Sequence, residues 1–118
     1  MATWHRIGDA AELRARVPCA LSVERHTIAL FHYEGRFRAL GNACNHKGGP
    51  LCQGRMQGEF VVCPWHGWEY SVVTGRGPEG YDEEQVPVFE VANVMVFLAS
   101  DYASYLTGEV VSVSSQHP

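Results

Sequence analysis

Two pairs of metal-binding side chains stand in two loop-like segments of the chain. Cys44 and His46 form a C-x-H pair, Cys63 and His66 form a C-x-x-H pair, and sixteen residues separate the two pairs. Each segment therefore offers one soft thiolate and one imidazole. Two thiolates on one iron and two neutral imidazoles on its neighbour suit a two-iron, two-sulfide cluster held between paired loops. Because imidazoles replace anionic thiolates, such a cluster is reduced at about −150 to +300 mV, against roughly −400 mV for a cluster with four cysteines.

A zinc ion held by the same two cysteines and two histidines is the alternative. Zinc modules usually keep both cysteines in one knuckle and both histidines in the other, whereas each segment here is mixed. The glycines around the pairs also favour a cluster, because backbone N–H groups must approach its sulfides closely. The residue types thus favour an iron–sulfur site over a zinc site.

The elements that must position these pairs are mostly β-strands. A turn at Glu34-Gly35 predicts a hairpin over residues 26–40, and Asp9 predicts the start of a short helix that ends by Arg16. Between Gly41 and Gly58 no periodicity remains, and a loop this long in a small domain usually has a function. The predicted strands are Thr3–Ile7, Ala20–Glu24, His26–Tyr33, Arg36–Leu40, Glu59–Cys63, Trp68–Val73 and Val86–Val91.

Composition and charge limit the cellular setting. The chain has 118 residues, of which 46% are hydrophobic, and this is enough for one domain. Its net charge of −4 disfavours nucleic acid as a partner, since a phosphate backbone requires a clustered cationic face. The longest apolar run, Val94 to Ala99, is far shorter than a membrane span, and Asp9 and Glu12 interrupt the place of a secretory signal. We therefore expect a soluble cytoplasmic protein with no membrane or nucleic-acid partner.

The other two cysteines, Cys19 and Cys52, have no neighbour at ligand spacing. Disulfides are disfavoured in a reducing cytosol. We interpret both residues as small apolar side chains or free thiols.

The two boxes around the metal-binding pairs resemble a known family. Residues 44–51, Cys-Asn-His-Lys-Gly-Gly-Pro-Leu, and residues 63–70, Cys-Pro-Trp-His-Gly-Trp-Glu-Tyr, resemble the cluster-binding boxes of Rieske-type ferredoxins and oxygenase Rieske domains. The resemblance covers about residues 3–91. It implies an all-β Rieske iron–sulfur fold, in which a cluster-binding subdomain (about 41–80) is inserted into an antiparallel β base.

The resemblance also implies roles for individual residues. Cys44 and Cys63 would hold the inner iron of a [2Fe-2S] cluster, and His46 and His66 would hold the outer, more exposed iron. Gly77-Pro78 matches the family's third loop, which carries a proline and covers the cluster.

Several positions depart from the high-potential respiratory members of the family. Gly49 and Trp65 stand where those proteins have two bridged cysteines, and Trp68 stands where they have a serine that donates to a bridging sulfide. Tyr70 does occupy the place of the tyrosine whose hydroxyl can reach a ligand sulfur. Because fewer hydrogen bonds reach the sulfurs, we predict a reduction potential in the lower part of the Rieske range.

The function implied by the resemblance is one-electron transfer, as the ferredoxin component of an oxygenase or related redox system rather than as a catalyst alone. The partners would be a reductase that donates the electron and an oxygenase or second reductase that accepts it. The alternative is a small Rieske subunit or fragment of an oxygenase or nitrite-reductase-like complex. The catalytic domain of such oxygenases holds a mononuclear iron through two histidines and a carboxylate. The remaining histidines of this chain show no pairing at helical spacing, which disfavours substrate oxidation by this chain alone. They are His5, His26, His32 and His117.

Residues 75–80, Gly-Arg-Gly-Pro-Glu-Gly, formally match a G-x-G-x-x-G dinucleotide loop. Such a loop must open a helix in a βαβ unit, and Pro78 and the following strand do not suit one. We therefore expect no nucleotide cofactor.

The C-terminal tail differs from that of a typical Rieske ferredoxin. Residues 90–113 resemble the last helix and strand of short-chain dehydrogenases/reductases, and the apolar spacing from Val91 to Tyr105 fits an amphipathic helix. No Tyr-x-x-x-Lys motif is present, so a dehydrogenase function does not follow. We predict a Rieske domain over residues 1–91 and a fused helix–strand tail over 92–118, in which residues 92–106 form a helix and 108–113 supply the last strand.

Overall fold

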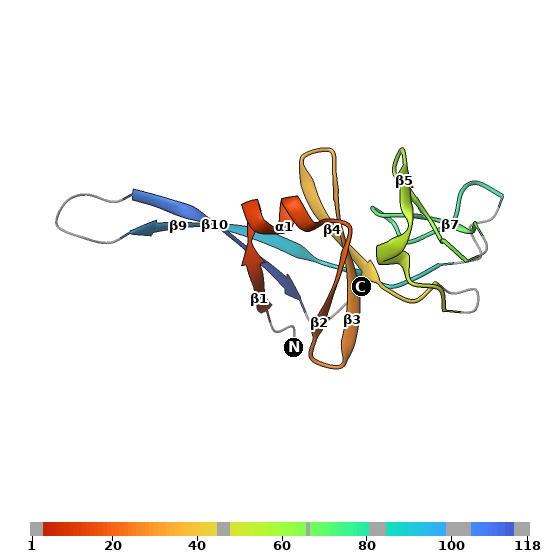
Figure 1. Ribbon diagram of the computed structural model, residues 1–118, viewed down its shortest axis with the longest axis horizontal. Helices are drawn as coiled ribbons and strands as arrows, with labels where there is room; N and C mark the ends of the chain where they lie inside the picture. The colour runs from red at the N-terminus through yellow and green to blue at the C-terminus, as the bar shows by residue number, and fades with distance from the viewer. Residues whose placement is uncertain (1–3, 45–47, 66, 81–84, 99–104, 115–118) are drawn as a thin grey trace.

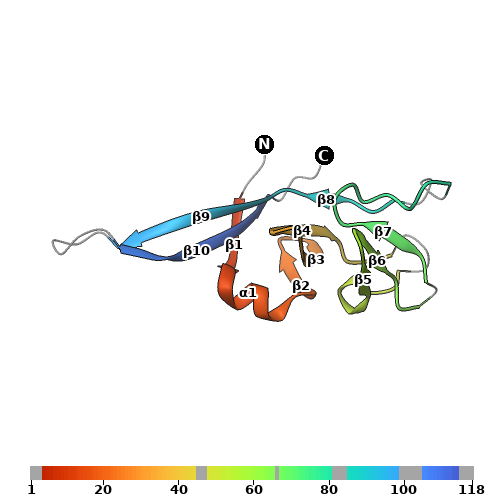
Figure 2. The ribbon, with the colours of Figure 1, turned by 90° about the horizontal axis from the view of Figure 1, so that it is seen from above.

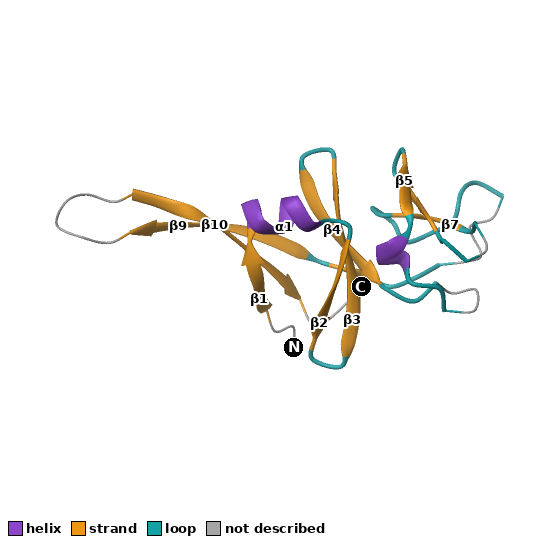
Figure 3. Ribbon diagram, in the orientation of Figure 1, coloured by secondary structure: helices purple, strands orange, loops and turns teal. Residues whose placement is uncertain are grey.

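The computed structural model describes residues 4–44, 48–65, 67–80, 85–98 and 105–114. The chain is mostly strand, with one short helix and one 3₁₀ turn (Figure 3). In chain order the elements are β1 (Trp4–Asp9), α1 (Ala10–Arg16), β2 (Cys19–Val23), β3 (His26–Tyr33), β4 (Arg36–Gly41), η1 (Leu51–Gln53), β5 (Arg55–Gln57), β6 (Phe60–Val62), β7 (Glu69–Ser71), β8 (Val88–Phe89), β9 (Val91–Leu98) and β10 (Tyr105–Ser114).

The strands form three antiparallel sheets. The first has the order β1-β10-β9, the second β2-β3-β4-β8 and the third β5-β6-β7. The small third sheet lies at one end of the molecule, and the β9–β10 hairpin extends from the other end (Figures 1 and 2). The predicted all-β architecture, an antiparallel base with an inserted subdomain, is confirmed.

The central strand β3 is buried on both faces. Ile28 and Leu30 point into a core shared with the first sheet and α1, whereas Ala29 and Phe31 point into a core shared with the third sheet. Side chains alternate across a strand, so consecutive residues serve opposite faces. Burial on both faces explains why residues 28–31 are all apolar. Because β3 contributes to both cores, it connects the base to the small sheet.

The predicted helix over residues 92–106 is wrong where the structure describes it. Residues 91–98 form β9, which pairs with β10 from Val91↔Val113 to Leu98↔Tyr105. The apolar run that fits a helical face also suits a strand, because β-branched residues are frequent in it. The long partner strand β10 decides between the two readings. Residues 99–104 lie outside the described residues.

Smaller differences concern strand limits. The predicted strand over 86–91 is interrupted at Glu90, whose carbonyl accepts from the Ser114 N–H at 3.0 Å. Strand β5 and turn η1 fall inside the stretch predicted as an irregular loop. Helix α1 forms as predicted, although the Asp9 side chain makes no capping hydrogen bond. In the described part of the chain, no helix is long and apolar enough to cross a membrane.

Candidate metal centre

The first cysteine-bearing loop closes on Cys44 through the backbone. The Cys44 N–H donates to the Gly49 carbonyl at 2.8 Å, and the Gly48 N–H donates to the Cys44 carbonyl at 2.9 Å. Gly48 has a φ of 72°, a left-handed conformation that glycine adopts without steric cost. These two hydrogen bonds therefore hold the end of the loop beside Cys44, the residue at its start.

The second loop closes on Cys63 in the same way. The Cys63 N–H donates to the Trp68 carbonyl at 2.7 Å, and the Gly67 N–H donates to the Cys63 carbonyl at 3.0 Å. Gly67 has a φ of 75°, and it stands four residues after its cysteine just as Gly48 does. Two loops of different sequence thus have the same backbone hydrogen-bond pattern around their cysteines.

The two loops also contact each other. A methyl group placed at Gly49 would lie 2.6 Å from Sγ of Cys63 and 3.1 Å from Cγ of Trp65, so only glycine fits there without displacing the second loop. Cys44 and Cys63 are both buried, with 3% and 1% of their surface exposed, and both belong to the core that joins β3 to the small sheet. The described parts of both loops lie at the end of the molecule opposite the β9–β10 hairpin (Figures 1 and 2).

A buried tyrosine reaches one of the two sulfurs. The hydroxyl of Tyr70 on β7 lies 3.2 Å from Sγ of Cys44, and Tyr70 is fully buried. Once Cys44 loses its proton to bind a metal, the hydroxyl is the donor of this hydrogen bond. The predicted contact of Tyr70 with a cysteine sulfur is confirmed.

Asn42 fixes the two ends of the first loop, a role that the sequence analysis missed. Its carboxamide Oδ1 accepts from the Cys52 N–H at 2.9 Å, and its carbonyl accepts from the Leu51 N–H at 2.8 Å. Asparagine often bonds to nearby backbone in turns, so its place just before Cys44 was the available signal. The signal does not reveal that its partners lie nine and ten residues away.

The described donors fit an iron–sulfur centre. Thiolates are the usual ligands of such clusters, and the space that Gly49 leaves beside Cys63 gives one sulfur room for a further bond. The two predicted imidazole ligands, His46 and His66, lie outside the described residues. Within the described ranges, no three histidine, cysteine, aspartate or glutamate side chains gather as a metal site. Of the predicted set, the structure describes the two cysteines, and both lie in the same buried core.

Comparison with known proteins decides the family. The family model described as "Rieske [2Fe-2S] domain" matches residues 3–90, which is most of the chain. The chain belongs to the Rieske [2Fe-2S] domain family. Membership implies a [2Fe-2S] cluster as the cofactor, in agreement with the buried cysteine pair.

Individual Rieske relatives are distant. A "Rieske domain-containing protein" of Homo sapiens is 32% identical over 76 residues, which cover 60% of this chain and 48% of the human protein. Among solved structures, the ferredoxin of carbazole 1,9a-dioxygenase from Nocardioides aromaticivorans IC177 is 21% identical with a TM-score of 0.71, covering 93% of this chain and 96% of that one. The structural likeness shows the Rieske fold. The chain spans less than half the length of the first curated relatives it matches.

The tail predicted to resemble a dehydrogenase has weak support. A stretch of 30 residues is 73% identical to (5R,7aS)-5-hydroxy-7a-methyl-1-oxo-2,3,5,6,7,7a-hexahydro-1H-indene-carboxyl-CoA reductase of Mycobacterium tuberculosis, and it covers 12% of that protein. The Rieske match itself ends at residue 90. Whatever its origin, the described tail is part of the fold, because β10 is the middle strand of the first sheet.

The Rieske loops contain the two positions at which the sequence analysis noted the loss of a disulfide. A methyl group at Gly49 would lie 3.1 Å from Cγ of Trp65, so the two positions are neighbours in space as they are in the family's paired loops. The third predicted loop is closed at its base by a bridge between Arg76 and Gln85 and by the Val86 N–H, which donates to the Gly75 carbonyl at 2.8 Å. Gly77 and Pro78 are half-buried in this loop.

The side chains of the remaining candidates take no part in the described site. Cys19 and Cys52 are half-buried free thiols, and burial raises the pKa of the Cys19 thiol, so it stays protonated at neutral pH. His32 packs edge-on against Phe37, and burial lowers its pKa. Residues 75–80 open no helix in the described part of the chain, which is unlike a dinucleotide loop.

Proposed function

We propose that the protein is a one-electron carrier that holds its [2Fe-2S] cluster through Cys44, His46, Cys63 and His66. The observation that carries the proposal is the pair of matched loops, each of which closes by the same backbone hydrogen bonds on a buried cysteine. When bound, the cluster accepts and releases one electron at a time. We assign Cys44 and Cys63 to the inner iron, and His46 and His66 to the outer iron.

The chain's own residues prepare the inner side of this site. The core around the two thiols includes Phe31, Leu51 and Val61, all fully buried, and this apolar surrounding excludes water from the sulfurs. Low polarity penalises charge on a thiolate. Tyr70 offsets part of that penalty, because its hydroxyl donates toward Cys44.

The outer side of the site is the surface we assign to redox partners. Trp65, between Cys63 and His66 in the chain, has 57% of its surface exposed. Exposed aromatic side chains are frequent anchors of protein interfaces. We infer a cytoplasmic carrier that receives its electron from a reductase and passes it to an oxygenase or a second reductase through weak, transient contacts. The carbazole 1,9a-dioxygenase ferredoxin, a structural neighbour, supports an oxygenase system.

The spectrum of the purified protein tests the proposal. A mixed cysteine–histidine cluster gives visible absorption and, after reduction with dithionite, an electron paramagnetic resonance signal distinct from that of an all-cysteine cluster. A colourless protein that binds one zinc ion and no iron would overturn the proposal in favour of the zinc alternative.

Replacing His46 or His66 by cysteine tests the ligand assignment directly. We expect each substitution either to abolish cluster binding or to lower the reduction potential by about 100 mV or more, because exchanging both imidazoles for thiolates spans at least about 250 mV. The measurement is a potentiometric titration in which the visible absorption of the cluster reports its oxidation state. The matched control is His32→Gln, a histidine on β3, which should leave the potential unchanged. Unchanged potentials in both loop variants would contradict the assignment.

Replacing Tyr70 by phenylalanine tests the hydrogen bond to Cys44. The hydroxyl stabilises the more negative, reduced state, so its removal should lower the potential. A bond worth about 1.4 kcal/mol more to the reduced state than to the oxidised state shifts a one-electron potential by about 59 mV. Phenylalanine keeps the buried ring, so the fold should persist. Tyr33→Phe on β3 is the control, and a rise or no change in the Tyr70 variant would count against the donor role.

A further inference from the structure

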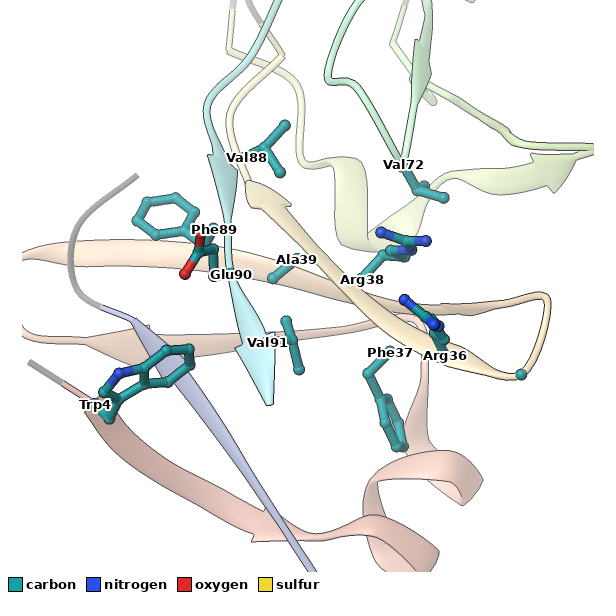
Figure 4. Close-up of a pocket in the computed structure, with 11 residues that line it drawn as sticks. Trp4, Arg36, Phe37, Arg38, Ala39, Val72, Val88, Phe89, Glu90 and Val91 are labelled. Atoms are coloured by element: carbon teal, nitrogen blue, oxygen red, sulfur yellow. The ribbon is translucent and has the colours of Figure 1, made fainter. Parts of the chain in front are cut away.

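A cavity lies on the base of the molecule, and no residue of either cysteine loop lines it. It has a volume of about 520 Å³ and lies beside β4, β8 and the first residues of β1 and β9 (Figure 4). Binding sites for small molecules usually measure about 300–1,000 Å³. The apolar part of its lining includes Val72, Val88, Val91 and the half-exposed Trp4.

Two arginines on one face of β4 supply the charge of this cavity. Arg36 and Arg38 are separated by one residue, so their side chains leave the strand on the same side. Figure 4 shows both guanidinium groups in the cavity on the side of Val72. Strand β4 pairs with β8 only at Ala39 and Leu40, so β8 does not cover the edge of β4 beside the arginines.

Among the described residues, no carboxylate neutralises the positive charge of these arginines. In the part of the chain that the structure describes, no carboxylate lies within ion-pair distance of either guanidinium group. Nε of Arg38 is buried and has no hydrogen-bond acceptor there. Glu90 also lines the cavity, but its carboxylate points away from both guanidinium groups in Figure 4. Because Nε itself is closed to solvent, an anion in the cavity would bind the rest of each guanidinium group, and Arg36 is exposed while Arg38 is half-buried.

We propose that this cavity binds a small organic anion, namely a carboxylate carried on a flat apolar body. A guanidinium fork matches the two oxygens of a carboxylate, and Arg36 and Arg38 present two such forks together. The valines and the exposed ring of Trp4 provide an apolar wall for the rest of the ligand. None of the proposed cluster ligands lines the cavity, so this site is independent of the electron-transfer proposal.

Calorimetric titration of the cluster-loaded protein with sodium 1-naphthoate tests the site. We expect saturable binding at one site per chain. The neutral 1-naphthamide, which has nearly the same shape, should bind at least about tenfold more weakly because it lacks the charge. This comparison uses the unchanged protein, so it does not depend on the folding of a variant.

Arginine variants locate the binding. Arg38→Gln should weaken naphthoate binding by about tenfold or more, and Arg36→Gln should weaken it several-fold. Arg55→Gln, which changes an exposed arginine on β5, should leave the affinity unchanged. Melting temperature and cluster absorption show whether each variant folds. The proposal would be overturned if naphthoate showed no saturable binding or if the amide bound equally well. It would also be overturned if the folded Arg36 and Arg38 variants bound naphthoate as tightly as the unchanged protein.

Discussion

A chain that ends after Val91 should fail to fold and should bind no cluster. The deletion removes β10, the middle strand of the first sheet, which pairs with β1 at five positions from Trp4↔Ser114 to Asp9↔Val110. It also removes Val111 and Val113, which are fully buried against residues from β3 and α1. The first sheet would be reduced to one unpaired strand.

The expected loss of stability is comparable to the whole stability of a small domain. Burying two valines contributes about 3–6 kcal/mol, and domains of this size are stable by about 5–15 kcal/mol. The open core face of β3 would add to the loss, since Ile28 and Leu30 belong to the same core as the deleted valines. The fold therefore depends on the tail that the sequence suggests was joined to the domain.

Circular dichroism and iron content measure this outcome. The truncated chain should show no cooperative thermal transition and no visible cluster absorption after reconstitution. A matched control deletes only residues 115–118 and keeps β10 whole, so it should melt close to the full chain. If the chain ending at Val91 melted like the full chain and held the same iron, the tail would be dispensable and the role of β10 in the core would be refuted.

The sequence was most informative where local chemistry determines structure. The Glu34-Gly35 turn between two apolar runs predicts the β3–β4 hairpin, and both residues of the pair adopt left-handed backbone angles. The helix over residues 10–16 agrees with the start that Asp9 predicts and with the predicted end by Arg16. The tail was misread because its apolar spacing from Val91 to Tyr105 fits a helical face, whereas a short continuous apolar run such as Val94 to Ala99 is equally consistent with a buried strand. Only pairing with β10, a contact between distant residues, settles the question.

For the site, the sequence predicted the donors and the structure supplied their surroundings. Cysteine–histidine spacing identified the two loops, and the family resemblance indicated that Tyr70 reaches a cysteine sulfur, as it does. The spacing could not reveal that a side chain at position 49 would collide with Cys63, because this closeness depends on how two loops meet in space. The arginine pair on β4 carries no motif, and its importance appears only with the cavity beside it.

The contact at Gly49 leads to the second large effect: Gly49→Ala should strongly reduce cluster binding. The added methyl group would lie 2.6 Å from Sγ of Cys63, well inside van der Waals contact, and 3.1 Å from the Trp65 ring. Cys63 is almost fully buried and its sulfur is one bond from Cβ, so relief requires the sulfur or the loop to move. Overpacking of this kind costs about 1–3 kcal/mol, and here the cost falls on a proposed ligand.

Gly48→Ala is the matched control, because it changes the neighbouring residue of the same loop. Among the described residues, a methyl group at Gly48 meets nothing within 4 Å, but φ there is 72°, so alanine adds backbone strain without a clash with them. The left-handed conformation costs an alanine about 1–2 kcal/mol. Gly48→Ala should therefore lower the melting temperature yet keep most of the iron, whereas Gly49→Ala should lose more than half of it. Equal iron content in the two variants would show that the close approach of the loops does not control cluster binding, and the inner half of the site would need another arrangement.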